Sequence, residues 1–242
     1  MNLPLVLRNC FMALLCVLAS SVWAHVPQLV LGLDSTACPG GCAPLAAIQK
    51  PHASLDVYRD RLVWAQSVAG ADAKIVVKPE CIEWWSASEA APRFVLRVDE
   101  QQQDRESAYR KLWVDALARV FYAQSLWYRV QYDPAFPLEV KAKSQGGESR
   151  LSTGDAIASA DRGEVALVIR NKSDKPVKVL PMLMDRAYEI IDLQSVELAP
   201  GQITEVSWVA EREPRYGSVI LRASGQLAPP KFTGFGIKYQ AP

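Results

Sequence analysis

The stretch from Asp104 to Pro137, DRESAYRKLWVDALARVFYAQSLWYRVQYDPAFP, is the longest run of β-prone and aromatic residues in the chain. Large side chains recur at alternate positions from Val120 to Tyr132, and a period of two is typical of a strand with one buried face. Pro134 and Pro137 follow, and proline cannot donate a hydrogen bond to a neighbouring strand. We therefore expect two long strands that complete one domain, followed by a turn into the next.

The rest of the chain consists of short apolar or alternating runs separated by turns. Upstream of the opening stretch these runs are Pro27–Leu33, Ala46–Lys50, Leu55–Trp64, Lys74–Pro79 and Arg93–Val98. Downstream they are Glu164–Arg170, Val177–Met184, Tyr188–Leu193, Ile203–Val209, Ser218–Ala223 and Phe232–Tyr239. Short strands at this spacing, without a convincing helical period, are typical of β-sandwiches. The sequence predicts an all-β chain with two immunoglobulin-like β-sandwich domains, residues 25–140 and 141–242.

Residues 1–24 have the features of a secretory signal peptide. Arg8 provides the positive charge of the N-terminal region, and Phe11–Leu18 forms a short apolar core. Val22-Trp23-Ala24 then places small residues at the positions that a signal peptidase recognises. This order predicts cleavage after Ala24. The apolar run is too short for a transmembrane helix, and a lipid anchor at Cys16 is disfavoured by the large residue before it. We expect export to the periplasm without membrane insertion.

Composition restricts the classes of function. The chain has 242 residues and a formal net charge of +1. It lacks a long block of like charges, so composition gives no argument for binding nucleic acid or an anionic membrane. The chain has only two histidines, His25 and His52. Ser–His or Cys–His catalysis would therefore have almost no base to use. We expect a protein that is not an enzyme.

The mature N-terminus offers an alternative function. Cleavage after Ala24 makes His25 the first residue, and its amine and imidazole together can chelate copper. A secreted β-sandwich copper protein would need at least one more ligand, and His52 is the only other histidine. An uninvolved terminal residue is the simpler interpretation, and we expect no cofactor and no metal site.

Three cysteines remain after removal of the signal peptide: Cys38, Cys42 and Cys81. Cysteines in an oxidising compartment form disulfides, and the turn in CPGGC, Cys38–Cys42, can close a small loop. Cys81 would then be a buried thiol, and a bond from Cys81 to one of the pair is the competing connectivity. A redox pair usually has two intervening residues and sits before a helix. A structural disulfide between Cys38 and Cys42 is therefore the favoured interpretation.

Several segments together resemble a known family. Lys74–Pro79 (KIVVKP) is followed by a turn at Ser86–Pro92, then by Arg93–Val98 and the pair Tyr109-Arg110. The second half contains ALVIRNKSDKPVKV and LAPGQ. This order and spacing resembles the periplasmic pilus-assembly chaperones of the chaperone–usher pathway, and their alternative, or α-type, branch in particular. The resemblance covers most of the mature chain and rests on no single sharp motif.

The resemblance implies a chaperone that binds pilin subunits by donor-strand complementation and delivers them to an outer-membrane usher. In this mechanism the chaperone lends a strand to the incomplete pilin sandwich. The donor strand would be the last long strand of the first domain, Val120–Tyr132. Val120, Tyr122 and Leu126 would fill the pilin groove.

The resemblance also implies an anchor for the carboxylate at the pilin C-terminus. Arg129 matches the basic residue near the end of the donor strand, and a guanidinium suits a carboxylate. The family's second basic anchor is missing from Pro27–Leu33, and Arg61 is a weak candidate to replace it. A structural pilus subunit or adhesin is a further alternative, although a subunit would be a single incomplete sandwich.

Overall fold

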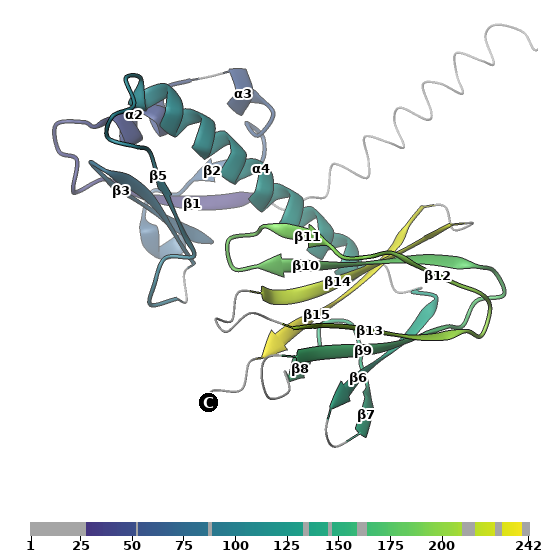
Figure 1. Cartoon of the computed structure of the whole chain (residues 1–242). Helices are drawn as coiled ribbons and strands as arrows, with labels where there is room; N and C mark the ends of the chain where they lie inside the picture. Colours follow the sequence, from purple (N-terminus) through teal and green to yellow (C-terminus); the bar gives the residue numbers. More distant parts are fainter. Residues whose placement is uncertain are drawn as a thin grey trace, which may run out of the picture.

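The computed structural model describes residues 28–51, 53–86, 89–132, 136–144, 147–158, 164–209, 216–225 and 229–238. The expected signal peptide lies outside these residues, as do His25 and His52. The described chain is mostly β and forms three sheets, as the sequence predicts for its overall class. It has two units, which differ from each other in architecture (Figure 1).

A five-stranded mixed sheet forms the N-terminal unit, in the order β2-β1-β3-β4-β5. The strands are β1 Leu29–Asp34, β2 Leu62–Trp64, β3 Ala73–Lys78, β4 Cys81–Ser86 and β5 Phe94–Arg97. β1 pairs in parallel with β2 and β3, whereas β3, β4 and β5 are antiparallel. Parallel pairing requires long crossover connections. These contain the helices α2 Ala43–Gln49 and α3 Ala53–Asp56 and the short helix η1 Val68–Gly70.

The core of this unit lies between the sheet and its helices. Helix α2 packs against α4, Arg105–Tyr132, and both contribute to one buried cluster with the sheet. Trp84 of β4 and Trp113 of α4 are fully buried there, with ring centroids 5.9 Å apart. The prediction of an immunoglobulin-like sandwich is therefore wrong for this unit, because helices and not a second sheet cover its sheet.

The opening stretch of the sequence forms helix α4 and not the predicted pair of strands. The Asp104 carboxylate accepts a hydrogen bond from the Ser107 N–H at 3.0 Å and caps the helix. Buried residues recur at helical intervals of three and four: Tyr109, Trp113, Ala116, Leu117, Val120, Phe121 and Ala123. The exposed Tyr122 and the half-buried Tyr128 add large side chains at alternate positions, and this produces the pattern of a strand.

The C-terminal half is the predicted β-sandwich. One sheet has the order β13-β9-β6-β7, and the other has the order β11-β10-β14-β15-β8, with β12 also paired to β10. The first consists of β6 Leu138–Ser144, β7 Gly147–Arg150, β9 Glu164–Asn171 and β13 Ile203–Val209. The second consists of β8 Ala156–Ala158, β10 Val177–Asp185, β11 Ile190–Asp192, β12 Val196–Leu198, β14 Tyr216–Gly225 and β15 Lys231–Lys238. Their facing apolar side chains form one core.

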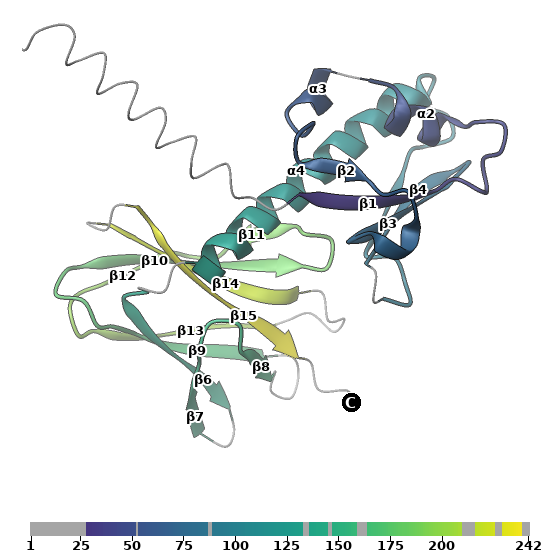
Figure 2. The same ribbon diagram turned by 180° about the vertical axis from the view of Figure 1, so that it is seen from behind.

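Helix α4 extends from the N-terminal unit onto the second sheet of the sandwich (Figures 1 and 2). Leu126 and Val130 pack there in a separate buried cluster with Met182, Ile220 and Phe232. Gly234 of β15 makes this approach possible, because a Cβ atom at that position would lie 3.2 Å from the Trp127 ring. The same helix therefore contributes to the packing of both units.

Candidate binding site at the junction of the two units

The residues predicted to fill a pilin groove do not form one surface. Val120 lies in the core of the N-terminal unit, and Leu126 lies in the cluster between α4 and the sandwich. Tyr122 is 53% exposed. Donor-strand complementation requires a strand with free backbone groups, whereas a helix uses these groups internally. The prediction of a donor strand at Val120–Tyr132 is therefore wrong.

The two predicted anchor arginines contact different elements. The Arg129 guanidinium, in the last turn of α4, lies 5.4 Å from the ring centroid of Phe232 in the sandwich. Arg61 precedes β2, and its carbonyl oxygen accepts a hydrogen bond from the Leu29 N–H at 2.7 Å. Arg129 thus packs on an aromatic ring and does not end a strand as the family resemblance requires.

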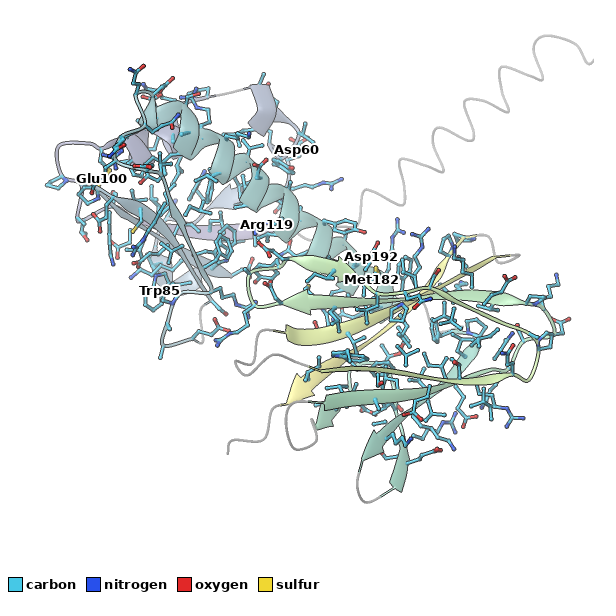
Figure 3. All side chains as sticks on the ribbon, viewed as in Figure 1. Asp60, Trp85, Glu100, Arg119, Met182 and Asp192 are labelled. Atoms are coloured by element: carbon cyan, nitrogen blue, oxygen red, sulfur yellow. A yellow bond between two sulfur atoms is a disulfide. The ribbon has the colours of Figure 1, made fainter. Side chains whose placement is uncertain are left out.

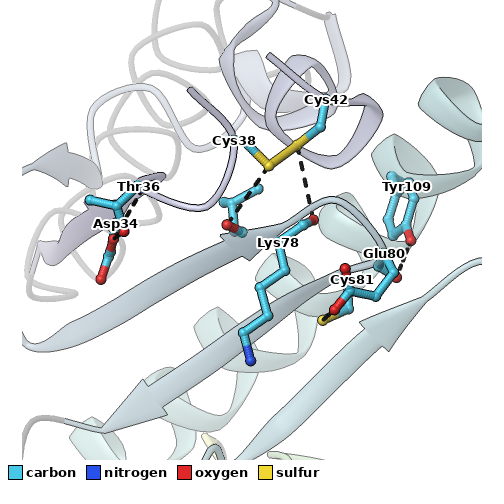
Figure 4. Close-up of a disulfide and its surroundings, with 9 residues drawn as sticks. Asp34, Thr36, Cys38, Cys42, Lys78, Glu80, Cys81 and Tyr109 are labelled. Atoms are coloured by element: carbon cyan, nitrogen blue, oxygen red, sulfur yellow. Dashed lines mark hydrogen bonds between the residues drawn. A yellow bond between two sulfur atoms is a disulfide. The ribbon is translucent and has the colours of Figure 1, made fainter. Parts of the chain in front are cut away.

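The disulfide between Cys38 and Cys42 is formed as predicted (Figure 4). It lies beside the end of β3, where the two sulfur atoms approach the carbonyl oxygens of Val77 and Lys78 at 3.9 Å. Cys81 is a buried free thiol paired with Lys78 across the β3–β4 hairpin. Side chains of paired residues share a face, and Lys78 points away from the disulfide in Figure 4. This geometry explains why Cys81 is not a partner in the disulfide.

An open cavity of about 530 Å³ lies where the two units meet. The N-terminal unit supplies two charged residues from the segment between β4 and β5, and α4 supplies an indole. The turn between β10 and β11 and the adjoining ends of β14 and β15 supply the rest. The lining residues are Glu89, Arg93, Trp127, Met184, Asp185, Arg186, Tyr188, Gly217, Ser218, Gly236 and Ile237.

A charged network crosses this cavity. Oε1 of Glu89 lies 3.1 Å from a guanidinium nitrogen of Arg93 and 3.5 Å from one of Arg186. Arg93 and Glu89 belong to the N-terminal unit, whereas Arg186 belongs to the sandwich. Arg119 projects from α4 (Figure 3), and its Nη1 lies 2.7 Å from Oε1 of Glu189 in the same turn of the sandwich. These contacts tie the turn to the N-terminal unit.

Tyr188 occupies the centre of the turn in an uncommon conformation. Its φ angle of 62° is in the left-handed region, which a bulky side chain rarely adopts and which often marks functional positions. The guanidinium of Arg93 lies 5.0 Å from the centroid of the Tyr188 ring. Burial raises the pKa of Tyr188 above its ordinary value of 10.0, against the opposing effect of Arg93.

Three polar atoms of the lining residues are buried and have no hydrogen-bond partner among the residues that the structure describes. They are Oε2 of Glu89, Nε of Arg93 and Oγ of Ser218. Ser218 itself is only 4% exposed. Unpaired buried polar groups are uncommon in folded proteins and call for an explanation. Their convergence on one cavity makes it the candidate binding site.

The sequence does not predict this site. Its local patterns predict that Arg93 begins a strand, that Glu89 lies in a polar turn and that Tyr188 begins another strand. The local pattern SASEAAPRF shows charges four apart beside a proline, but it does not indicate a partner in DRAYE, residues 185–189. Within the described residues no cluster of three or more His, Cys, Asp or Glu side chains could hold a metal ion.

Comparisons of the chain with known protein families and with curated proteins found no match in either case. Among the described residues, no helix is long and apolar enough to cross a membrane.

Proposed function

We propose that this protein is an exported assembly factor that holds a segment of a partner protein in the junction cavity. The cavity is the observation that carries the proposal. Its volume of about 530 Å³ is typical of ligand-binding clefts, which occur preferentially between structural units. Trp127, Met184 and Ile237 give it apolar surface beside the charged network.

The proposal keeps the class of partner that the family resemblance implies and changes the mode of contact. Pilin subunits are the first candidate partners, and an outer-membrane usher is the second. The proposed contact does not include donation of a strand by Val120–Tyr132, because this segment is helical. Export to the periplasm through residues 1–24 belongs to the proposal, as does a binding rather than a catalytic role.

Filling the cavity tests the proposal without disturbing the fold. A Cβ atom added at Gly217 meets no atom of the described part of the chain within 4 Å, and Gly217 lines the cavity. We expect the side chain introduced by Gly217→Val to reduce the space for a ligand at this edge of the cavity. Co-purification with a pilin subunit co-expressed in the periplasm should fall roughly tenfold or more, with an unchanged melting temperature.

A matched control is Gly40→Val, because a Cβ atom at Gly40 also has no described residue within 4 Å. Gly40 lies in the disulfide loop and does not line the cavity. This variant should retain the pilin at the level of the unaltered chain. Equal retention by Gly217→Val would show that the partner binds elsewhere. Absence of every candidate pilin from the unaltered chain would refute the assembly-factor proposal.

A further inference from the structure

We propose that the junction cavity recognises an uncharged amide group within an apolar peptide segment, and not a carboxylate. This inference rests on the proposed function, since it names the chemical class of ligand for the same cavity. Three properties of the lining carry it: the balance of charge, the unpartnered polar atoms and the apolar wall.

The formal charges of the lining cancel. Arg93 and Arg186 are positive, while Glu89 and Asp185 are negative. The Glu89 carboxylate already pairs with both guanidiniums, at 3.1 Å from Arg93 and 3.5 Å from Arg186. A ligand carboxylate would meet two fixed carboxylates, and a ligand ammonium would meet two fixed guanidiniums. Since like charges at an interface are strongly unfavourable, a neutral ligand group is selected.

The unpartnered atoms require a ligand that both donates and accepts hydrogen bonds. Nε of Arg93 can only donate, and Oε2 of Glu89 as a carboxylate oxygen can only accept. The hydroxyl of Ser218 can do either. A peptide amide offers an N–H donor and a carbonyl acceptor in one neutral group. Supplying such partners removes the free-energy cost of leaving these buried atoms unpaired.

The remaining lining suits an apolar, extended segment. Trp127, Met184 and Ile237 provide side-chain surface. Gly217 and Gly236 lie at the adjoining ends of β14 and β15, and a Cβ atom at Gly236 would have its nearest contact at 3.9 Å. Glycine in a strand often marks close approach by another backbone. A peptide chain with small or apolar side chains can therefore lie against these two strands.

The experiment compares two forms of the same peptide. Short, acetylated, leucine-rich peptides carry either a C-terminal amide or a free carboxylate, and calorimetric titration of the full chain measures their dissociation constants. We expect the amide form to bind roughly tenfold more tightly. Glu89→Gln removes one negative charge, so the net charge of the lining becomes +1. The preference for the amide form over the carboxylate form should therefore shrink. Glu197→Gln, an exposed change on β12, should leave the preference unaltered.

The outcomes separate the inference from the proposed function. Equal or tighter binding of the carboxylate form to the unaltered chain would overturn the inference alone. Failure of both forms to bind, while a pilin subunit still co-purifies and Gly217→Val prevents it, would also overturn only the inference. Failure of both forms together with absence of any co-purifying pilin would overturn the proposed function itself.

Discussion

Tyr188 links backbone geometry, burial and charge at one position of the cavity. Its half-buried side chain lies against the guanidinium of Arg93 from the N-terminal unit, and its φ of 62° is in the left-handed region. Burial opposes ionisation of the phenol, so the folded protein holds this proton to a higher pH than the unfolded chain does. The residue should therefore influence how the stability of the protein depends on pH.

The predicted dependence lies in the alkaline range. Above the unfolded pKa of 10.0 the folded state binds more protons than the unfolded state, so stability falls as the pH rises toward the folded pKa. Tyr188→Phe should reduce this loss, as measured by melting temperatures between pH about 9 and 12. Part of the loss should remain in the variant, because burial also raises the pKa of Tyr58. An identical alkaline profile in Tyr188→Phe would contradict the prediction.

At the scale of one element, α4 shows how a strand pattern and a helix pattern can coexist in one stretch. Strand alternation places Val120, Tyr122 and Leu126 on the same face. In the helix Val120 and Leu126 are 1% and 4% exposed, whereas Tyr122 is 53% exposed. Leu126 and Val130, at the end of the helix nearest the sandwich, are buried because a sheet lies against them. The sequence of the helix alone does not indicate the position of that sheet.

Two substitutions distinguish the helix from the strand. Leu126→Ala should lower the free energy of unfolding by about 2–4 kcal/mol, because it leaves a cavity between α4 and the sandwich. Tyr122→Ala should change it by no more than about 0.5 kcal/mol, since the side chain is largely exposed. Urea denaturation of the two variants measures both values. Similar losses at the two positions would favour the strand.

At the scale of the whole molecule, α4 couples the two units. Trp113 packs with the first sheet, and Val130 packs with the sandwich, within one continuous helix. The ion pair between Arg119 and Glu189 is partly exposed, at 31% and 44% of the two side chains. Exposed pairs contribute only about 0–1 kcal/mol. The buried apolar packing of α4 is therefore the stronger link between the units.

This coupling predicts a single calorimetric transition, with equal calorimetric and van't Hoff enthalpies. The double variant Leu126→Ala/Val130→Ala weakens the packing of α4 on the sandwich and should separate the transition into two. Arg119→Ala removes the ion pair and the contact of the guanidinium with the Phe94 ring, but it leaves the apolar packing of α4 on the sandwich intact. This variant should keep one transition and serves as the control. Two transitions in the unaltered chain would show that α4 does not couple the units.

The sequence by itself determined the mostly β class, the sandwich of the C-terminal half and the Cys38–Cys42 disulfide. Each of these depends on short-range signals: alternating apolar residues bounded by turns, and a loop that brings two cysteines together. The sequence also contained the capping Asp104 and the buried helical positions after it. Aromatic residues also occur outside the buried positions of α4, so the helical period of three to four residues is weak in the sequence.

Only the tertiary structure decided the mixed sheet of the N-terminal unit, the course of α4 across both units and the cavity between them. Parallel pairing of β1 with β2 and β3 depends on contacts between distant segments, which alternation does not specify. Glu89 and Arg186 meet because α4 fixes two separate units side by side. A binding site assembled from such distant side chains exists only once long-range packing has placed them together.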